Sequence, residues 1–97
     1  MTVARHYVMH AAPGKDATLE TALRALAEQV RPLPGCEGVE LLRDIGNELR
    51  FVFIEKWASV DAHKDAGSLL PKEATAAFGA ALDGPPEGSY LDYLSVI

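Results

Sequence analysis

The sequence predicts an α+β fold in which helices cover only one face of a four-stranded antiparallel sheet. Stretches with strand-like alternation and helix-like spacing follow one another in the order strand, helix, strand, strand, helix, strand, the ferredoxin-like βαββαβ arrangement. The central stretch, residues 49–57, is apolar on both faces. A strand of this kind has to be covered on both sides, and the chain has helices for only one layer.

The first half of the chain begins with a strand and a helix. Residues 3–11 alternate as a strand does, which places Tyr7 and His6 on opposite faces. An Ala-Pro-Gly turn follows, and Asp16 is expected to be the N-cap of a helix that ends at the prolines of residues 32–34. Spacings of four, three, four and three give this helix one apolar stripe: Leu19, Leu23, Leu26, Val30 and Leu33.

The second and third strands are predicted to form an antiparallel hairpin. Residues 36–45 and 49–57 have strand patterns. Between them, Gly46 and Asn47 tolerate the positive φ of a tight hairpin turn.

The third strand also predicts how the protein assembles. Phe51 and Phe53 point to one face of the strand, and Val52 and Ile54 to the other. Because each buried Val or Ile contributes about 1.5–3 kcal/mol, a face of such residues left in water would be unusual for a monomer. We therefore expect two copies to pack sheet against sheet as a symmetric homodimer.

The last part of the chain is predicted to contain helix and strand. Ser59 is a good N-cap for a short helix, which Gly67-Ser68 interrupts. A further helix is expected over residues 70–82 because its apolar residues recur along one edge. A Gly-Pro-Pro loop at residues 84–86 then leads to a last strand at residues 90–97.

Length and composition indicate one ordinary globular domain, residues 1–97. The net charge of −5 argues against a nucleic-acid partner, since such binding depends on cationic neutralisation of phosphates. No apolar run approaches the roughly 18–20 residues needed to cross a membrane, and no leader-like segment is evident. A cytoplasmic location is expected, and the single cysteine, Cys36, cannot form an internal disulfide.

Three segments resemble the antibiotic biosynthesis monooxygenase family of dimeric α+β barrel proteins. They are PGCEG at residues 34–38, LLRD at residues 41–44 and FVFIEKWAS at residues 51–59. The resemblance covers nearly the whole chain, and its most specific element is Phe-x-x-x-Glu-x-Trp before a small residue and a helix cap. It implies a dimeric α+β barrel. Members include cofactor-free oxygenases of aromatic polyketides and quinols, haem-degrading enzymes, and small proteins of no assigned reaction.

One histidine departs from the family pattern. Members often carry a histidine about nine or ten residues after this tryptophan, where this chain has Ala66 and Gly67. His63, six residues after Trp57, is its counterpart only if one helical turn has been lost. The departure counts most against a haem-degrading activity, in which a helix histidine holds the iron.

Three residues are the leading candidates for chemistry, and each also has a purely structural interpretation. Trp57 can direct its N–H into a pocket between sheet and helices, or only anchor the helix to the sheet. Glu55, on the same strand face, can act as a base or acceptor, or form an ion pair or cap. His63 suits a general base near neutral pH, or is a solvated or packed polar residue.

Other reactive residues have weaker support. His6 and His10 lie about 13 Å apart along an extended strand and cannot bind one metal ion together. Cys36 has no cationic run or CxxC partner to lower its pKa and is expected to pack. Tyr90 and Tyr93 can donate hydrogen bonds to a phenolic substrate or simply pack. No phosphate loop, dinucleotide fingerprint or zinc spacing is present. The resemblance to cofactor-free oxygenases implies that neither a metal nor a cofactor is needed.

The favoured hypothesis is a cofactor-independent monooxygenase that acts with dioxygen on a small aromatic or quinol-type molecule. His63 or Glu55 would be the base, and Trp57 and Tyr7 would shape the pocket and orient the substrate. The alternatives are a non-catalytic dimeric binding or structural module of the same fold and a haem-binding relative. Four residues are expected to contact the substrate: Tyr7, His6, Phe53 and Phe78.

Overall fold

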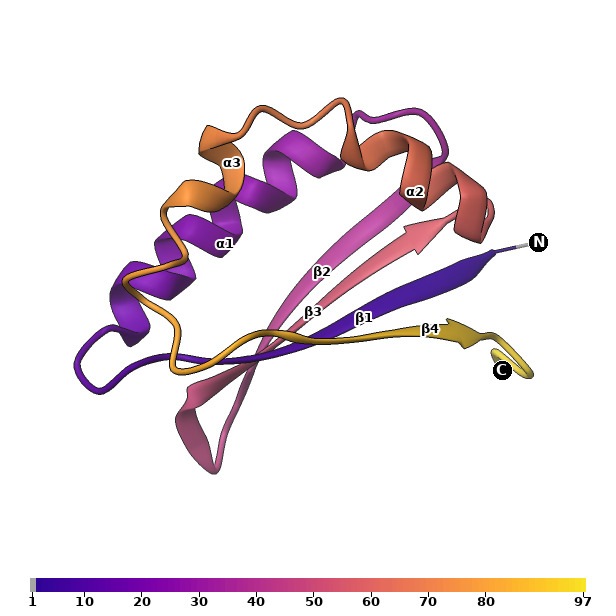
Figure 1. Ribbon diagram of the computed structural model, residues 1–97. Helices are drawn as coiled ribbons and strands as arrows, with labels where there is room; N and C mark the ends of the chain where they lie inside the picture. The colour runs from indigo at the N-terminus through magenta and orange to yellow at the C-terminus, as the bar shows by residue number, and fades with distance from the viewer. Residues whose placement is uncertain (1) are drawn as a thin grey trace.

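The computed structural model describes residues 2–97, so Met1 of the predicted domain lies outside the described residues. The chain follows the predicted βαββαβ order with one additional helical turn, and all strand pairs are antiparallel in the order β2-β3-β1-β4 (Figure 1). No helix in this described part is long and apolar enough to cross a membrane. The elements are β1 (Val3–His10), α1 (Asp16–Val30), β2 (Cys36–Asp44), β3 (Asn47–Trp57), α2 (Val60–Gly67), α3 (Glu73–Ala76) and β4 (Glu87–Asp92).

The helices lie over one face of the sheet, and the alternation of β3 decides which side chains meet them (Figure 1). Phe51 and Phe53 are 1% and 0% exposed on the helix side, whereas Val52 and Ile54 are only half-buried on the outer side. The helix-side face ends in buried Trp57. The division of β3 into two faces is therefore confirmed, and so is the ferredoxin-like α+β fold of a four-stranded antiparallel sheet under one helical layer.

Helix α1 supplies most of the layer over the sheet. Four of the five residues of its predicted apolar stripe are buried, with Leu19 and Leu23 fully inaccessible to solvent, whereas Leu33 follows the helix and is half-buried. Asp16 was the wrong N-cap: the N-cap is Lys15, which makes no side-chain capping bond and whose carbonyl accepts from the Leu19 N–H at 2.9 Å. Asp16 instead lies in the first turn, where its charge suits the positive end of the helix dipole.

The β2–β3 hairpin is confirmed, but its turn differs from the prediction. In residues 2–97 only glycines 14, 35 and 84 have positive φ, so Gly46 and Asn47 do not use that conformation. The Asp44 carboxylate instead accepts a hydrogen bond from the Gly46 N–H at 2.7 Å. A register shift between Arg43 and Asp44 accommodates this side-chain-supported turn.

Two boundaries in the last third were wrong. The expected helix over residues 70–82 contains only one helical turn, α3. Its N-cap position, Lys72, makes no side-chain capping bond, and the chain continues as turns over residues 77–81, where Gly79 disfavours a helix. The expected strand over residues 90–97 is β4, Glu87–Asp92. It ends at Asp92 because that residue pairs with Val3, where β1 begins, and nothing in β1 remains to pair with residues 93–97.

Gly35 joins the start of β2 to the end of β3 beside α2. Its φ is +85°, and a Cβ built on it would lie 2.8 Å from the Ala62 Cβ. Its carbonyl accepts from the Ala58 N–H at 2.8 Å. Glycine is therefore required here both by backbone conformation and by the close approach of α2.

We expect Gly35→Ala to lower the free energy of unfolding more than Gly84→Ala does. Both glycines have φ of +85°, but no atom lies within 4 Å of a Cβ built at Gly84. The control should cost about 1–2 kcal/mol for the left-handed backbone alone, and Gly35→Ala should add the contact with Ala62. Chemical denaturation measures both; equal losses would show that the α2 contact relaxes without cost.

Candidate active site

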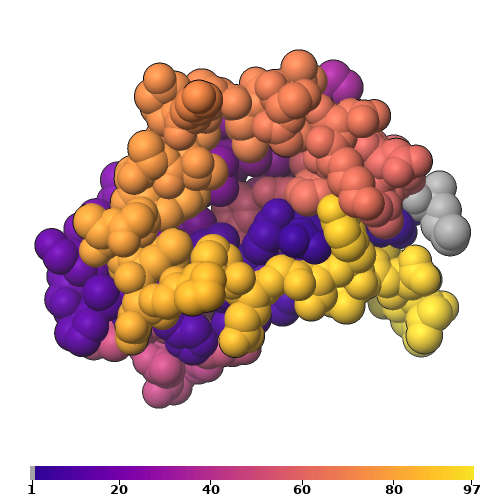
Figure 2. All heavy atoms as spheres, viewed as in Figure 1, coloured from indigo at the N-terminus to yellow at the C-terminus, as the bar shows by residue number. Residues whose placement is uncertain are grey.

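A cavity of about 580 Å³ lies between the sheet and the helical layer. Figure 2 shows the molecule hollowed between the orange segment around α3 and the sheet. Apart from Thr75, the hydrogen-bonding side chains of its wall are Tyr7, Glu55, Trp57 and His63. The rest of the wall is mainly apolar and includes Met9, Leu26, Val30, Phe53, Phe78 and Leu82.

The local fold brings His63 against the end of β3. Helix α2 starts directly after β3, and the Ser59 Oγ accepts a hydrogen bond from the Ala62 N–H at 3.0 Å, as predicted for an N-cap. His63 is the next residue, one turn into the helix. Its ring consequently lies edge-on to the Trp57 ring, with centroids 5.5 Å apart.

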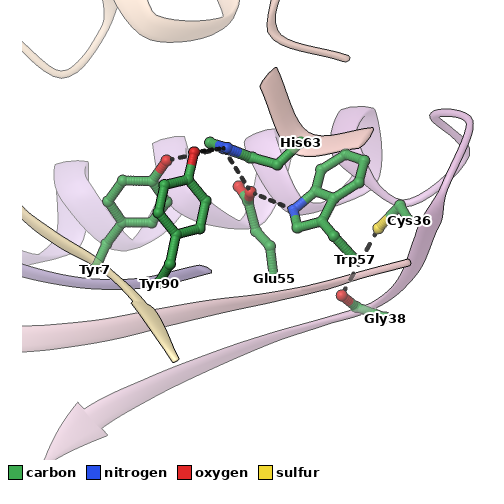
Figure 3. A network of polar contacts seen from close by, with 7 residues as sticks. All are labelled: Tyr7, Cys36, Gly38, Glu55, Trp57, His63 and Tyr90. Carbon is green, nitrogen blue, oxygen red and sulfur yellow. Dashed lines mark hydrogen bonds and ion pairs between the residues drawn. The ribbon is translucent and has the colours of Figure 1, made fainter. Parts of the chain in front are cut away.

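Three polar side chains, Tyr7, Glu55 and Tyr90, form a connected group with the Trp57 and His63 rings (Figure 3). The Trp57 Nε1–H donates to the Glu55 Oε1 at 2.9 Å. The His63 Nε2 lies 3.2 Å from the Tyr7 hydroxyl, and the Nδ1 lies 2.7 Å from the Tyr90 hydroxyl. Both imidazole nitrogens are therefore engaged by tyrosines.

Burial shifts the pKa values of the two ionisable groups toward each other. Glu55 is 5% exposed, and this burial raises the pKa of its carboxyl above the ordinary 4.5, although the Trp57 hydrogen bond and the Arg5 charge oppose the rise. Burial, followed by the charges of Arg5 and Lys64, lowers the pKa of His63 below 6.5. The 3.6 Å between the Glu55 Oε1 and the His63 Nε2 is therefore a contact with an uncharged imidazole at neutral pH, not an ion pair.

Arg5 is a site residue that the sequence analysis missed. Its guanidinium carbon lies 4.8 Å from the Tyr7 ring centroid and 4.3 Å from that of Tyr90, so it packs against both phenols. The available signal was strand alternation, which places Arg5 on the same face as Tyr7. The β1–β3 register then sets Arg5 opposite Glu55. Burial raises the pKa of Tyr7, while the hydrogen bond with Arg5 acts in the opposite direction.

The structure brings most of the proposed site residues together. Six of the seven line the cavity, and His6 does not. It points to the outer face of the sheet because it alternates with Tyr7 along β1 and pairs with Ile54. The expectation that His6 faces this cavity is therefore wrong. The six that line it are Tyr7, Glu55, Trp57, His63, Phe53 and Phe78.

Neither a metal cluster nor a reactive thiol is evident. In residues 2–97, no three side chains of His, Cys, Asp or Glu come together as metal ligands. Burial raises the pKa of the Cys36 thiol, which favours its unreactive protonated form.

The family model for antibiotic biosynthesis monooxygenases matches residues 2–68, which include β1, α1, the β2–β3 hairpin and α2. This chain belongs to that family. The match contains Tyr7, Glu55, Trp57 and His63, whereas Tyr90 lies beyond it.

Solved structures have the same fold. A Caulobacter crescentus protein assigned to this family is 30% identical, with a TM-score of 0.82 over 97% of this chain and 91% of that one. The protein PA3566 from Pseudomonas aeruginosa is 26% identical, with a TM-score of 0.81 over 97% and 95% of the two chains. SnoaB from Streptomyces nogalater, a cofactor-independent oxygenase, is 20% identical, with a TM-score of 0.84 over 99% and 96%. A search among curated proteins found no match.

We expect Trp57→Phe to make stability more sensitive to pH. The variant removes the N–H that holds the buried Glu55 carboxylate, so the pKa of Glu55 should rise further. Because the pKa of this carboxyl group is higher in the folded than in the unfolded state, the folded protein keeps the proton up to a higher pH. The free energy of unfolding therefore falls as pH rises from 4.5 through the folded-state pKa. The loss relative to the parent should therefore be larger at about pH 7 than at about pH 4, by roughly 1–3 kcal/mol.

Chemical denaturation at the two pH values separates the change in the Glu55 pKa from the loss of packing. The packing lost with the smaller Phe ring lowers the free energy of unfolding equally at both pH values. Glu55→Gln is the matched control, since a neutral amide oxygen still accepts from Trp57. In the Glu55→Gln background, the Trp57→Phe loss should be the same at about pH 4 and about pH 7. A Trp57→Phe loss that is independent of pH in the parent background would refute the assigned hydrogen bond.

Proposed function

We propose that this protein is a cofactor-independent monooxygenase that acts with dioxygen on a small aromatic or quinol-type molecule. The observation that carries the proposal is an uncharged, hydrogen-bonded His63 at the wall of a largely apolar cavity, beside Glu55 and Trp57. Family membership supports it, as does the fold shared with SnoaB, a cofactor-independent oxygenase. The volume of about 580 Å³ suits a small-molecule ligand.

The proposed reaction begins with removal of a proton from the substrate. An anthrone or quinol that loses a proton becomes an electron-rich anion, which can itself give electrons to dioxygen. Conversion of an activated CH₂ group to C=O then takes one dioxygen molecule and releases one water, so the substrate supplies all the electrons. The chain's task is to take the proton and to hold the anion away from bulk water.

His63 fits the role of base better than Glu55. Its imidazole is uncharged near neutral pH and contacts Tyr7, which lines the cavity. One Glu55 oxygen is already engaged by the indole of Trp57. In this assignment the Tyr7 hydroxyl helps orient the substrate anion, and Phe53 and Phe78 stack or pack against its rings.

The two alternative functions have less support. A haem iron would need a free imidazole nitrogen, but both nitrogens of His63 contact tyrosine hydroxyls. A non-catalytic binding module would leave the lowered pKa of a histidine at the cavity without a use. Oxygen uptake with anthrones and quinols separates such a module from an enzyme.

We also propose a homodimer formed through the outer face of the sheet. On that face Leu42 and Leu91 are 49% and 46% exposed, and Val8, Val52 and Ile54 are half-buried. A second copy would cover this apolar surface, and the opposite face would keep the cavity under the helices.

We expect the purified protein, free of metal and flavin, to consume oxygen with at least one member of a panel of anthrones and quinols. The rate should rise with pH around a midpoint below 6.5, because His63 must be unprotonated and its pKa is lowered. His63→Gln should reduce kcat by ~10²-fold or more. His10→Gln, at an exposed position of β1 outside the cavity, is the matched control and should keep the parent rate.

Two outcomes would count against this proposal. No oxygen uptake with any compound, combined with tight binding of the same compounds, would favour the binding module. A rate that survives His63→Gln but is lost in Glu55→Gln would transfer the role of base to Glu55.

We expect light scattering at micromolar concentration to give the mass of two subunits. Val52→Lys, in the middle of the outer face of β3, should shift this to one subunit because it would bury a charge between the sheets. Ile45→Lys, at the fully exposed β2–β3 turn, is the control and should leave the mass unchanged. A parent protein with the mass of one subunit would refute the proposed dimer.

A further inference from the structure

We propose that Tyr90, His63 and Tyr7 form a relay that carries the substrate's proton from the cavity to solvent, with Tyr90 as its exit. The inference rests on the proposed function and adds a residue that lies outside the part of the chain matched by the family model.

The geometry that supports the relay is the contact of one imidazole with two hydroxyls of different exposure. Tyr7 lines the cavity, and its hydroxyl lies 3.2 Å from the His63 Nε2. Tyr90 is not part of the cavity wall and is 37% exposed, and its hydroxyl lies 2.7 Å from the Nδ1. His63 therefore connects an inner hydroxyl with an outer one (Figure 3).

A neutral imidazole is suited to this task because one nitrogen carries a proton and the other accepts one. His63 acts as the base through the Tyr7 hydroxyl: the Tyr7 proton passes to Nε2 as the substrate's proton passes to the Tyr7 oxygen, and the hydroxyl so restored orients the anion. The Nδ1 proton then passes to the Tyr90 oxygen, whose own proton goes to water. One proton enters and one leaves, and His63 has exchanged one neutral tautomer for the other.

The charges around His63 favour passage of the proton over its retention. Arg5 and Lys64 disfavour an imidazolium ion, and burial acts in the same direction. Glu55, with its Oε1 3.6 Å from the Nε2, is the competing acceptor, but it is 5% exposed and has no comparable exit to water. The other side chains that contact the ring are the hydroxyls of Tyr7 and Tyr90 and the uncharged indole of Trp57.

Arg5 acts as a positioning residue for the relay. Its guanidinium packs on both phenol rings, at 4.8 Å from the Tyr7 centroid and 4.3 Å from the Tyr90 centroid. It therefore fixes the rings on either side of the imidazole, from β1 and β4. Gly88 leaves room for this, because a Cβ there would lie 2.5 Å from an Arg5 guanidinium nitrogen.

Tyr90→Phe tests the relay because it keeps the ring that packs on Arg5 and removes only the hydroxyl. We expect kcat for oxygen uptake to fall roughly tenfold with little change in KM. This loss is smaller than the one expected for His63→Gln, because water can still take the proton from the imidazole, although slowly. A small exogenous buffer base should restore the rate. Tyr93→Phe is the matched control: Tyr93 is 42% exposed and lies on the outer face.

An unchanged kcat in Tyr90→Phe, or a lower kcat that buffer does not restore, would overturn the relay and leave the proposed oxygenase intact. A second measurement does not depend on turnover. The exchange of the His63 ring N–H with water, followed by ¹⁵N NMR, should be slower in Tyr90→Phe than in the parent if the hydroxyl carries protons. If Tyr90 merely covers the histidine, exchange should be equal or faster, which would refute the relay even in a protein without activity.

Discussion

The desolvation of a carboxyl group and an imidazole at the wall of one apolar cavity is the constraint on which the site depends. Burial favours the uncharged form of each group, so the pKa of Glu55 rises and that of His63 falls. The indole N–H of Trp57 compensates part of the cost for the carboxyl group. Arg5 stabilises a carboxylate and, together with the larger effect of burial, opposes an imidazolium, so His63 is uncharged near neutral pH.

Strand alternation and one helix cap are sufficient to build this arrangement. The face of β3 that begins with two buried phenylalanines ends with Glu55 and Trp57, and the cap at Ser59 starts α2 immediately afterwards. His63 is thereby fixed one turn later over the indole. The same alternation gives β3 an apolar outer face, so the cavity and the proposed dimer surface arise from opposite sides of one strand.

The parts of this structure that the sequence could predict depend on short-range patterns. The element order, the two faces of β3 and the Ser59 cap follow from local spacing, and the side of β3 on which Glu55 lies follows with them. The position of Tyr90 beside His63 depends on the β1–β4 register, which no local pattern fixes. The contact of Arg5 with both phenols depends on that pairing as well.

A pH titration of Glu55 and His63 by NMR, with ¹³C and ¹⁵N labels on the two side chains, tests the central claim most directly. If desolvation governs the site, the Glu55 midpoint lies above 4.5 and the His63 midpoint lies below 6.5. An ion pair would move both midpoints the other way, because each charge would stabilise its partner. A Glu55 midpoint at or below 4.5 together with a His63 midpoint at or above 6.5 would contradict this account.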